Sequence, residues 1–276
     1  MSQVIQVDID QVLRTRAARY YRYIPGWAVR WLARMLRQDE LNAMLRKIGD
    51  KQGVDAADVV LDDLGITLQP HGMDNIPAQG RFIFASNHPL GGLDGLALIS
   101  LLGHHYRGDI RFLVNDLLMA VTPLRSIFLP VNKFGRQSRE GVTAIEQEYA
   151  GDRQMLTFPA GLCSRRQPDG SIADLRWNKF VVTSAIGHHR DIIPVYFNGQ
   201  NSARFYRLAQ WRKRLGIKVN LEQALLPAEV FKSRGATFDI YVGRPIGWQT
   251  LDGSHALDQA ATLRDIVYHL KPQKSP

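Results

Sequence analysis

The chain has 276 residues, of which 45% are hydrophobic and 22% charged, and this composition is typical of a globular protein and excludes a largely disordered one. Its formal net charge of +9 favours a polyanionic partner, such as nucleic acid, an anionic membrane surface or a phosphate-bearing substrate. The single cysteine, Cys163, excludes an intramolecular disulfide and a multi-cysteine metal site, and the N-terminus does not read as a secretory signal.

The first 64 residues are predicted to form an N-terminal helical segment, in which arginines alternate with aromatic and aliphatic side chains over residues 9–50. The arginines are Arg14, Arg16, Arg19, Arg22, Arg30, Arg34 and Arg37, and the aromatic residues are Tyr20, Tyr21, Tyr23, Trp27 and Trp31. Trp and Tyr prefer the headgroup level of a bilayer and Arg binds anionic lipid, so the segment is a candidate for membrane docking. A helix pair packed on the protein body, with its arginines in solvent, explains the same pattern.

Residues 65–250 are predicted to form an α/β domain, because short apolar runs alternate with helical patterns. The expected strands are 81–86, 110–115, 128–132, 154–158, 192–198 and 238–242, and the expected helices are 93–102, 116–125, 138–149, 177–187 and 203–215. The fold class that follows is a single mixed, largely parallel sheet flanked by helices. Residues 251–276 are expected to form a C-terminal helix, at 255–270, and a tail. No stretch reaches the roughly 18 consecutive apolar residues that a spanning helix needs.

A histidine and an aspartate flank a turn in the stretch FASNHPLGGLDG at 84–95, between a predicted strand and a predicted helix. In α/β sheets, ligands bind in loops at the carboxyl ends of strands. The two glycines allow the turn to bring the Asp94 carboxylate back to the His88 imidazole, and a histidine held by an aspartate acts as a general base. We therefore predict that His88 and Asp94 are catalytic. Taken alone, the loop also fits a helix-capping Asp94 beside a structural His88.

Three further stretches follow this loop: LPVNKFGR at 129–136, FPAGLCSR at 158–165 and IPVYF at 193–197. In this order, the four stretches resemble the motifs of the glycerolipid and lysophospholipid acyltransferases, whose first motif is His-x4-Asp. In that family a basic residue of the second motif helps to hold an acidic acceptor, and the strand of the fourth borders the acyl pocket. The resemblance covers about residues 70–245.

The motifs depart from the family pattern at two points. Five residues separate His88 from Asp94 instead of four, and Ala160 stands where the third motif usually carries Glu. Any role of that Glu in binding the acceptor is therefore absent or supplied elsewhere. The spellings NHPLGGLDG and FPAGLCSR are most similar to a bacterial subgroup that includes O-acyltransferases of ornithine- and glycine-lipid synthesis, many of them labelled hemolysins.

The resemblance implies transfer of a fatty acyl group from a thioester, on acyl carrier protein or coenzyme A, to the hydroxyl of a lyso-lipid acceptor. His88 would take the hydroxyl proton and Asp94 would orient its ring. The residues expected to bind acceptor or donor are Asn87, Lys133, Arg136, Pro159, Gly161, Ser164 and Arg165. The protein would work as a peripheral protein on an anionic membrane surface, at the cytoplasmic face of the inner membrane. No metal or redox cofactor is implied, and no nucleic-acid motif is visible.

Two further features of the site are expected. Backbone N–H groups near Gly161 are candidates for stabilising the oxyanion, and the donor chain is expected in an apolar groove lined by Leu96, Leu98, Phe112 and Leu117. A basic cluster follows the third motif and would bind an anionic head group or carrier phosphate, or is simply solvated. Its members are Arg165, Arg166, Arg176 and Lys179.

The acceptor and the function class stay open at the level of sequence. A lyso ornithine or glycine lipid is the favoured acceptor, because both departures fall where the acceptor should bind. The alternative is a 1-acylglycerol-3-phosphate acyltransferase of phospholipid synthesis. A further alternative is a non-catalytic membrane-binding or hemolysin-like protein, against which the intact His88 and Asp94 argue.

Other candidate sites are weaker. Cys163 as a nucleophile would need a nearby base, so a buried thiol is the preferred interpretation. The pairs His104-His105 and His188-His189 are interpreted as helix ends, because adjacent side chains point apart and make poor joint metal ligands. The stretch GDKQG at 49–53 lacks the spacing and the preceding strand of a phosphate-binding loop.

Overall fold

The computed structural model describes residues 6–16, 18–131, 138–217 and 220–272. Its centre is a seven-stranded sheet in the order β1-β9-β8-β2-β5-β3-β4. The strands are β1 (Thr67–His71), β2 (Phe82–Ser86), β3 (Ile110–Asn115), β4 (Phe128–Val131), β5 (Gln154–Thr157), β8 (Asp191–Phe197) and β9 (Thr237–Val242). Neighbouring strands are parallel except β8 and β9, which are antiparallel. The mixed, largely parallel sheet predicted from the sequence is confirmed.

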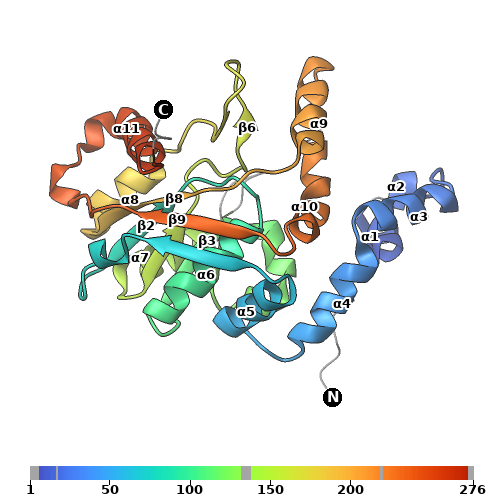
Figure 1. The fold of residues 1–276 in the computed structure, drawn as a ribbon, viewed down its shortest axis with the longest axis horizontal. Helices are drawn as coiled ribbons and strands as arrows, with labels where there is room; N and C mark the ends of the chain where they lie inside the picture. The colour runs from blue at the N-terminus through green and yellow to red at the C-terminus, as the bar shows by residue number, and fades with distance from the viewer. Residues whose placement is uncertain (1–5, 17, 132–137, 218–219, 273–276) are drawn as a thin grey trace.

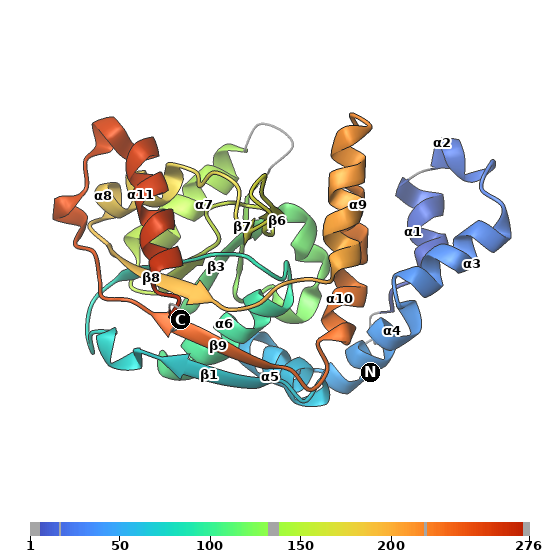
Figure 2. The same ribbon diagram turned by 45° about the horizontal axis from the view of Figure 1, so that its top comes forward.

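Helices cover both faces of this sheet (Figure 1 and Figure 2). Helices α5 (Gly53–Asp63) and α6 (Leu93–His105) pack on one face, and α7 (Arg139–Ala150), α8 (Phe180–His188) and α11 (Ala256–His269) pack on the other. Alternate residues of β2 point to opposite faces, so Phe84 joins the first core and Ile83 the second. A central parallel strand buried on both sides needs an uninterrupted apolar run, which the sequence FIFAS supplies.

The segment 116–125 differs from the prediction. It forms two 3-10 helices, η2 (Asp116–Ala120) and η3 (Thr122–Leu124), so the expected α-helix was wrong. Pro123 lacks a backbone N–H and disfavours the α conformation in the residue before it, which explains the interruption. Among the α-helices and strands of the described residues, four were not predicted: β1, α10 (Leu226–Lys232) and the two short strands β6 (Arg165–Arg166) and β7 (Ile172–Ala173). β1 contains Pro70, which is compatible with its place at the edge of the sheet.

The N-terminal residues are helical, as predicted: α1 (Ile9–Arg16), α2 (Ala18–Tyr21), α3 (Gly26–Met35) and α4 (Gln38–Ile48). Helices α1–α3 stand away from the sheet in both views (Figures 1 and 2). Met44 and Ile48 of α4, by contrast, join the core that α5 and α6 form with the sheet. The division of the chain at residue 64 stays a prediction. In the part of the chain that the structure describes, no helix has the length and apolar character needed to span a bilayer.

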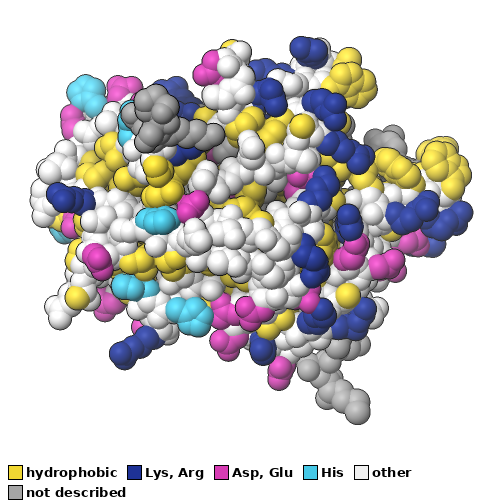
Figure 3. Space-filling model, viewed as in Figure 1, with side chains coloured by type: hydrophobic (Ala, Val, Ile, Leu, Met, Phe, Trp, Pro, Cys, Tyr) yellow, Lys and Arg dark blue, Asp and Glu magenta, His cyan; other side chains and the backbone are white. Residues whose placement is uncertain are grey.

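Helix α9 (Ala203–Arg214) follows β8 and stands, with α10, between the sheet and the N-terminal helices (Figures 1 and 2). In the space-filling view, Lys and Arg side chains gather along α9, and hydrophobic side chains lie at its free end (Figure 3). Hydrophobic and basic side chains are also grouped at the outer end of the N-terminal helices in the same view.

Candidate active site

The expected contact between His88 and Asp94 is present at the carboxyl end of β2. His88 follows the strand, Asp94 lies in the first turn of α6, and the turn between them places His88 Nδ1 2.9 Å from Asp94 Oδ2. The fifth intervening residue therefore does not separate the pair. The Asp94 side chain is fully buried, whereas 16% of the His88 side chain is exposed. An inaccessible carboxylate thus supports an imidazole that substrate can reach.

Backbone N–H groups complete the hydrogen bonding of the Asp94 carboxylate. Those of Leu90 (2.8 Å) and Gly91 (3.3 Å) donate to Oδ2, and those of Gly92 (3.0 Å) and Gly95 (2.9 Å) donate to Oδ1. Burial raises the pKa of Asp94, but the adjacent imidazole and the backbone N–H groups outweigh it, so that the pKa lies below its ordinary value. The carboxylate is therefore ionised at neutral pH.

Gly91 is needed within this turn. Its φ of +77° lies in the left-handed region that favours glycine. A Cβ at this position would lie 2.8 Å from the Leu226 side chain and 3.2 Å from that of Cys163. A larger residue would therefore strain the turn that returns Asp94 to His88 and would force the Leu226 side chain to move.

The tautomer of His88 follows from its partner. An ionised carboxylate can only accept hydrogen bonds, so Asp94 fixes the proton of the neutral imidazole on Nδ1 and leaves Nε2 as the basic nitrogen. The Phe158 ring stacks on the imidazole, with centroids 3.9 Å apart and planes inclined by 17°. The hydrogen bond and the stacking together hold the ring in one orientation.

Asp174 holds the His88 loop from another side and was not anticipated. Its Oδ1 accepts hydrogen bonds from the His88 backbone N–H (3.1 Å) and the Ser164 hydroxyl (2.6 Å), and its Oδ2 accepts one from the Trp177 indole (3.0 Å). The Ser164 N–H also donates to the His88 carbonyl at 2.7 Å. Burial raises the pKa of Asp174, and these hydrogen bonds offset the rise only in part. No local pattern in the sequence marks this residue.

Asn87 lies next to His88 but points into the protein. Its Nδ2 donates to the Phe197 carbonyl (3.0 Å) and its Oδ1 accepts from the Phe197 N–H (2.6 Å), which joins the carboxyl ends of β2 and β8. Asn87 and Ser164 are both buried. Because their polar groups are engaged by the protein, we assign both residues to positioning the loop, in place of the substrate contacts that we expected.

Arg165 is likewise engaged inside the protein. Its Nη2 lies 2.8 Å from Glu222 Oε1, and Arg212 Nε lies 2.8 Å from the second oxygen of the same buried carboxylate. Arg165 Nη1 also donates to the Cys163 carbonyl at 2.6 Å. We assign Arg165 to this buried network and not, as we expected, to an anionic ligand. Burial raises the pKa of the Cys163 thiol, which agrees with its interpretation as an inert buried residue.

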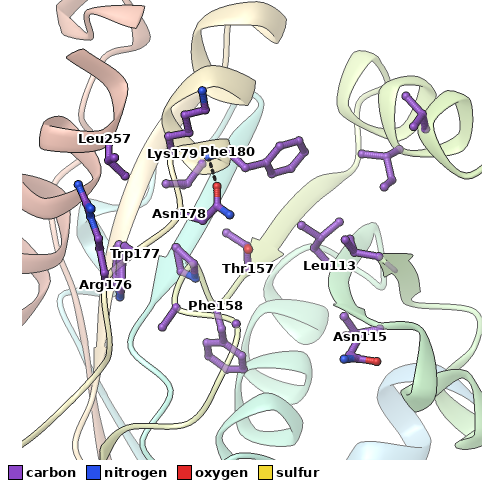
Figure 4. Close-up of a pocket in the computed structure, with 18 of the residues that line it drawn as sticks. Leu113, Asn115, Thr157, Phe158, Arg176, Trp177, Asn178, Lys179, Phe180 and Leu257 are labelled. Carbon is purple, nitrogen blue, oxygen red and sulfur yellow. Dashed lines mark hydrogen bonds between the residues drawn. The ribbon is translucent and has the colours of Figure 1, made fainter. Parts of the chain in front are cut away.

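An apolar pocket of about 940 Å³ lies at the carboxyl ends of β3, β4 and β5. Figure 4 shows Phe158 at one end of this pocket and Lys179 and Phe180 at the other. Phe158 also stacks on His88, so one of the rings that line the pocket contacts the imidazole. Its lining includes two predicted site residues, Pro159 and Gly161, and the apolar side chains Leu113, Val131, Val142, Ile145 and Leu257.

The groove predicted from Leu96, Leu98 and Phe112 was wrong. These residues pack in the core on the α6 face of the sheet, whereas the pocket lies on the opposite face and is lined by Leu113. Neighbouring strand residues point to opposite faces, so the expected set was displaced by one position in β3. The side chain of Leu117 lies outside the described part of the structure.

Other predicted residues fall into three groups. Lys133 and Arg136 lie outside the described residues. Arg176 and Lys179 line the pocket and are exposed, and Arg166 is exposed on β6. Of the backbone N–H groups near Gly161, that of Gly161 itself donates to the Phe158 carbonyl at 2.9 Å, and the φ of +63° at Gly161 explains the glycine. Stabilisation of an oxyanion by N–H groups in this turn stays a prediction.

The two adjacent histidine pairs lie at helix ends, as predicted. His104 and His105 end α6, and His188 ends α8 with His189 as its C-cap. His104 Nε2 lies 2.8 Å from Asp58 Oδ2, and these two residues are not among those that line the pocket. Within the described ranges, no group of three or more His, Cys, Asp or Glu side chains is arranged to hold a metal ion.

Comparison with known proteins identifies the family of this chain. Residues 11–275 match the family model described as acyltransferase. A lyso-glycine lipid O-acyltransferase of Phocaeicola vulgatus is 44% identical over 268 residues, which cover 97% of this chain and 96% of that protein. The protein of the same name from Bacteroides thetaiotaomicron is 44% identical over 265 residues, covering 96% of this chain and 97% of its own.

Among solved structures, the 1-acyl-sn-glycerophosphate acyltransferase of Thermotoga maritima aligns with 97% of this chain and 100% of its own, at a TM-score of 0.48 and 15% identity. The assignment depends on the family model and on the two relatives, which match nearly the whole chain. The chain belongs to the acyltransferase family.

Proposed function

We propose that this acyltransferase transfers a fatty acyl group from a thioester, on acyl carrier protein or coenzyme A, to the hydroxyl of a lyso-glycine lipid. His88 is the general base and Asp94 orients it. The observation that carries the chemistry is the Nδ1–Oδ2 contact of 2.9 Å, which leaves Nε2 as the base beside an apolar pocket. The acceptor is supported by the names of the two relatives, each 44% identical over nearly the whole chain.

The reaction needs one proton carrier. His88 Nε2 takes the proton of the acceptor hydroxyl while the oxygen attacks the thioester carbonyl carbon. The tetrahedral intermediate then collapses, the new C–O ester bond remains and the C–S bond breaks. The thiolate leaves and takes the proton back from the imidazolium. The Asp94 carboxylate stabilises the imidazolium between these two steps, and general-base assistance of this kind contributes about 10²–10⁴-fold to the rate.

The pocket beside Phe158 is the site that we assign to the acyl chain of the donor. Its apolar walls suit a hydrocarbon chain, and burying each methylene stabilises the complex by about 0.8 kcal/mol. A chain held here would bring its carbonyl carbon towards the stacked rings of Phe158 and His88.

We further propose peripheral attachment to an anionic membrane surface through the N-terminal helices. Tyr23, Trp27 and Trp31 are 69%, 66% and 53% exposed, which is unusual for large apolar side chains on a protein that works in water alone. Arg30 and Arg34 lie on the same helix as the two tryptophans. Aromatic rings at the headgroup level with neighbouring arginines are typical of interfacial helices.

A side-by-side assay tests the acceptor. Purified enzyme is incubated with a lyso-glycine lipid or with lysophosphatidic acid, with acyl carrier protein and coenzyme A thioesters in separate reactions, and the products are identified by mass spectrometry. We expect an O-acylated glycine lipid, formed with a kcat/KM at least about tenfold higher than that for lysophosphatidic acid. The reverse preference would identify a 1-acylglycerol-3-phosphate acyltransferase. The His88→Ala variant controls for uncatalysed transfer.

A further inference from the structure

We propose that one face of α9 lies on an anionic bilayer and holds the His88 loop at the lipid surface. We call this face the α9 stripe; it consists of Arg204, Arg207, Trp211, Arg214 and Leu215. The inference rests on the proposed function, because it concerns how the site reaches an acceptor that is itself a membrane lipid.

The stripe is one continuous face of the helix. At 3.6 residues per turn, its five side chains fall within a sector of about 100°. All five are exposed, and Trp211 and Leu215 are 59% and 55% exposed. The opposite face carries Phe205, Tyr206 and Ala209, which are buried against the protein. The helix is therefore fully packed on one side and open on the other.

The chemistry of the stripe suits an anionic lipid surface. Three arginines accompany two large apolar side chains, and residues 203–215 contain no Asp or Glu. An interfacial helix places Trp and Leu at the boundary of headgroups and acyl chains while its cations bind lipid phosphates. A second copy of this chain is disfavoured as the partner, because a self-complementary contact would bring arginines of the same stripe together. An acidic protein would satisfy the arginines but gives no reason for two exposed apolar residues among them.

The stripe begins beside the active site. Asn201, two residues before α9, donates hydrogen bonds from its side chain to the carbonyls of Pro89 (3.1 Å) and Leu90 (3.3 Å), within the turn between His88 and Asp94. The 12 residues of α9 extend about 18 Å from this point. A helix lying lengthwise on the bilayer would thus fix the height of the His88 loop at the headgroup level. The N-terminal helices stand on the same side of the molecule as α9 (Figures 1 and 2), so both can meet one surface.

Flotation of the full-length protein with vesicles tests the stripe. Vesicles of phosphatidylglycerol mixed with phosphatidylcholine are compared with vesicles of phosphatidylcholine alone, for the wild type, Arg214→Glu and Lys213→Glu. The two variants change the net charge equally, at adjacent positions of the last turn, but Lys213 lies off the stripe. We expect Arg214→Glu to weaken binding to the anionic vesicles about tenfold or more, and Lys213→Glu to weaken it less than about threefold. Trp211→Ala should weaken binding as well, and circular dichroism checks that each variant is folded.

Three results would overturn the proposal. Equal binding by Arg214→Glu and Lys213→Glu would mean that only net charge matters. Unchanged vesicle binding with a raised KM for acyl carrier thioester would assign the stripe to the carrier protein. Unchanged binding by both Arg214→Glu and Trp211→Ala would leave membrane contact to the N-terminal helices alone. The first and third results do not depend on acyl transfer, whereas an inactive wild type that still floats with the vesicles would overturn only the proposed function.

Discussion

Replacing Asp94 by Asn tests the catalytic pair most directly, because the two side chains have the same shape. The carboxylate accepts five hydrogen bonds, one from the His88 ring and four from backbone N–H groups. An amide has only one oxygen, so its NH₂ group must face donors in either orientation. Directed at Gly92 and Gly95, the NH₂ group would leave two well-formed backbone N–H groups without an acceptor.

The other orientation of the amide costs less stability, but it prevents His88 from acting as a base. With its NH₂ group in the place of Oδ2, the amide loses two hydrogen bonds from backbone N–H groups. One is the short hydrogen bond from Leu90 (2.8 Å) and the other is the long one from Gly91 (3.3 Å). It can then donate to His88 Nδ1, provided that the imidazole moves its proton to Nε2. This orientation costs about 1–3 kcal/mol of stability, and it presents a donor where the reaction needs a base. By analogy with the wrong tautomer in serine proteases, we expect kcat to fall by about 10³–10⁴-fold.

The assay follows release of free thiol from an acyl coenzyme A donor, together with chemical denaturation. Raising the pH should not restore Asp94→Asn, because its defect is the tautomer and not the charge of the ring. Asp58→Asn is a matched control, since Asp58 pairs with His104 at 2.8 Å away from the proposed site, and its kcat should equal that of the wild type. An Asp94→Asn enzyme that is folded and keeps more than a tenth of wild-type kcat would refute this reasoning.

Two other outcomes follow from the same loop. His88→Ala should lower kcat by about 10²–10⁴-fold while its far-ultraviolet circular dichroism matches that of the wild type, and substantial residual transfer would mean that another base acts. The two buried carboxyls should affect stability with opposite dependence on pH, as measured by urea denaturation. The pKa of Asp94 is lowered from 3.8. The free energy of unfolding of the wild type should therefore exceed that of Asp94→Asn by a margin that decreases as the pH falls below that value. The pKa of Asp174 is raised from 3.8, so the margin in free energy of unfolding between the wild type and Asp174→Asn should decrease as the pH rises above 3.8. If the two margins changed with pH in the same direction, this reasoning would be contradicted.

The sequence predicted the elements whose pattern is local. The central strands are continuous apolar runs, and six of the expected strands occur within two residues of their predicted ends in the described part of the chain. β1 was missed because three of its five residues, Thr67, Gln69 and His71, are polar and exposed at the edge of the sheet, and because it contains Pro70. The reverse error occurred at 116–125, where apolar residues suggested a helix but Pro123 interrupts the backbone hydrogen bonding.

In the candidate site, too, the features that depend on neighbouring residues could be predicted and those that depend on distant residues could not. The proximity of His88 and Asp94 was predictable because both lie in one turn, and glycine explains how that turn closes. The tasks of Asn87 and Arg165 were not predictable, because their partners, Phe197 and Glu222, lie 110 and 57 residues away. From the sequence alone, a polar residue beside a candidate catalytic residue can be given either of two tasks: it can contact substrate, or it can hold the loop. Only its hydrogen-bond partner in the fold distinguishes the two.

The His88 loop is held from separate parts of the fold, and these contacts are present despite the change in the third motif. Asp174 and Ser164 bind the backbone of His88, and Asn201 binds the turn that follows it. Ser164 belongs to the third motif, whose usual Glu is replaced by Ala160 in this chain, yet the link between that motif and the His88 loop is intact. The substitution therefore removes a charge at the pocket without disturbing the base. Because Ala160 lines the pocket that we assign to the donor chain, we infer that the substitution makes the wall of that pocket more apolar and leaves the contact between His88 and Asp94 unchanged.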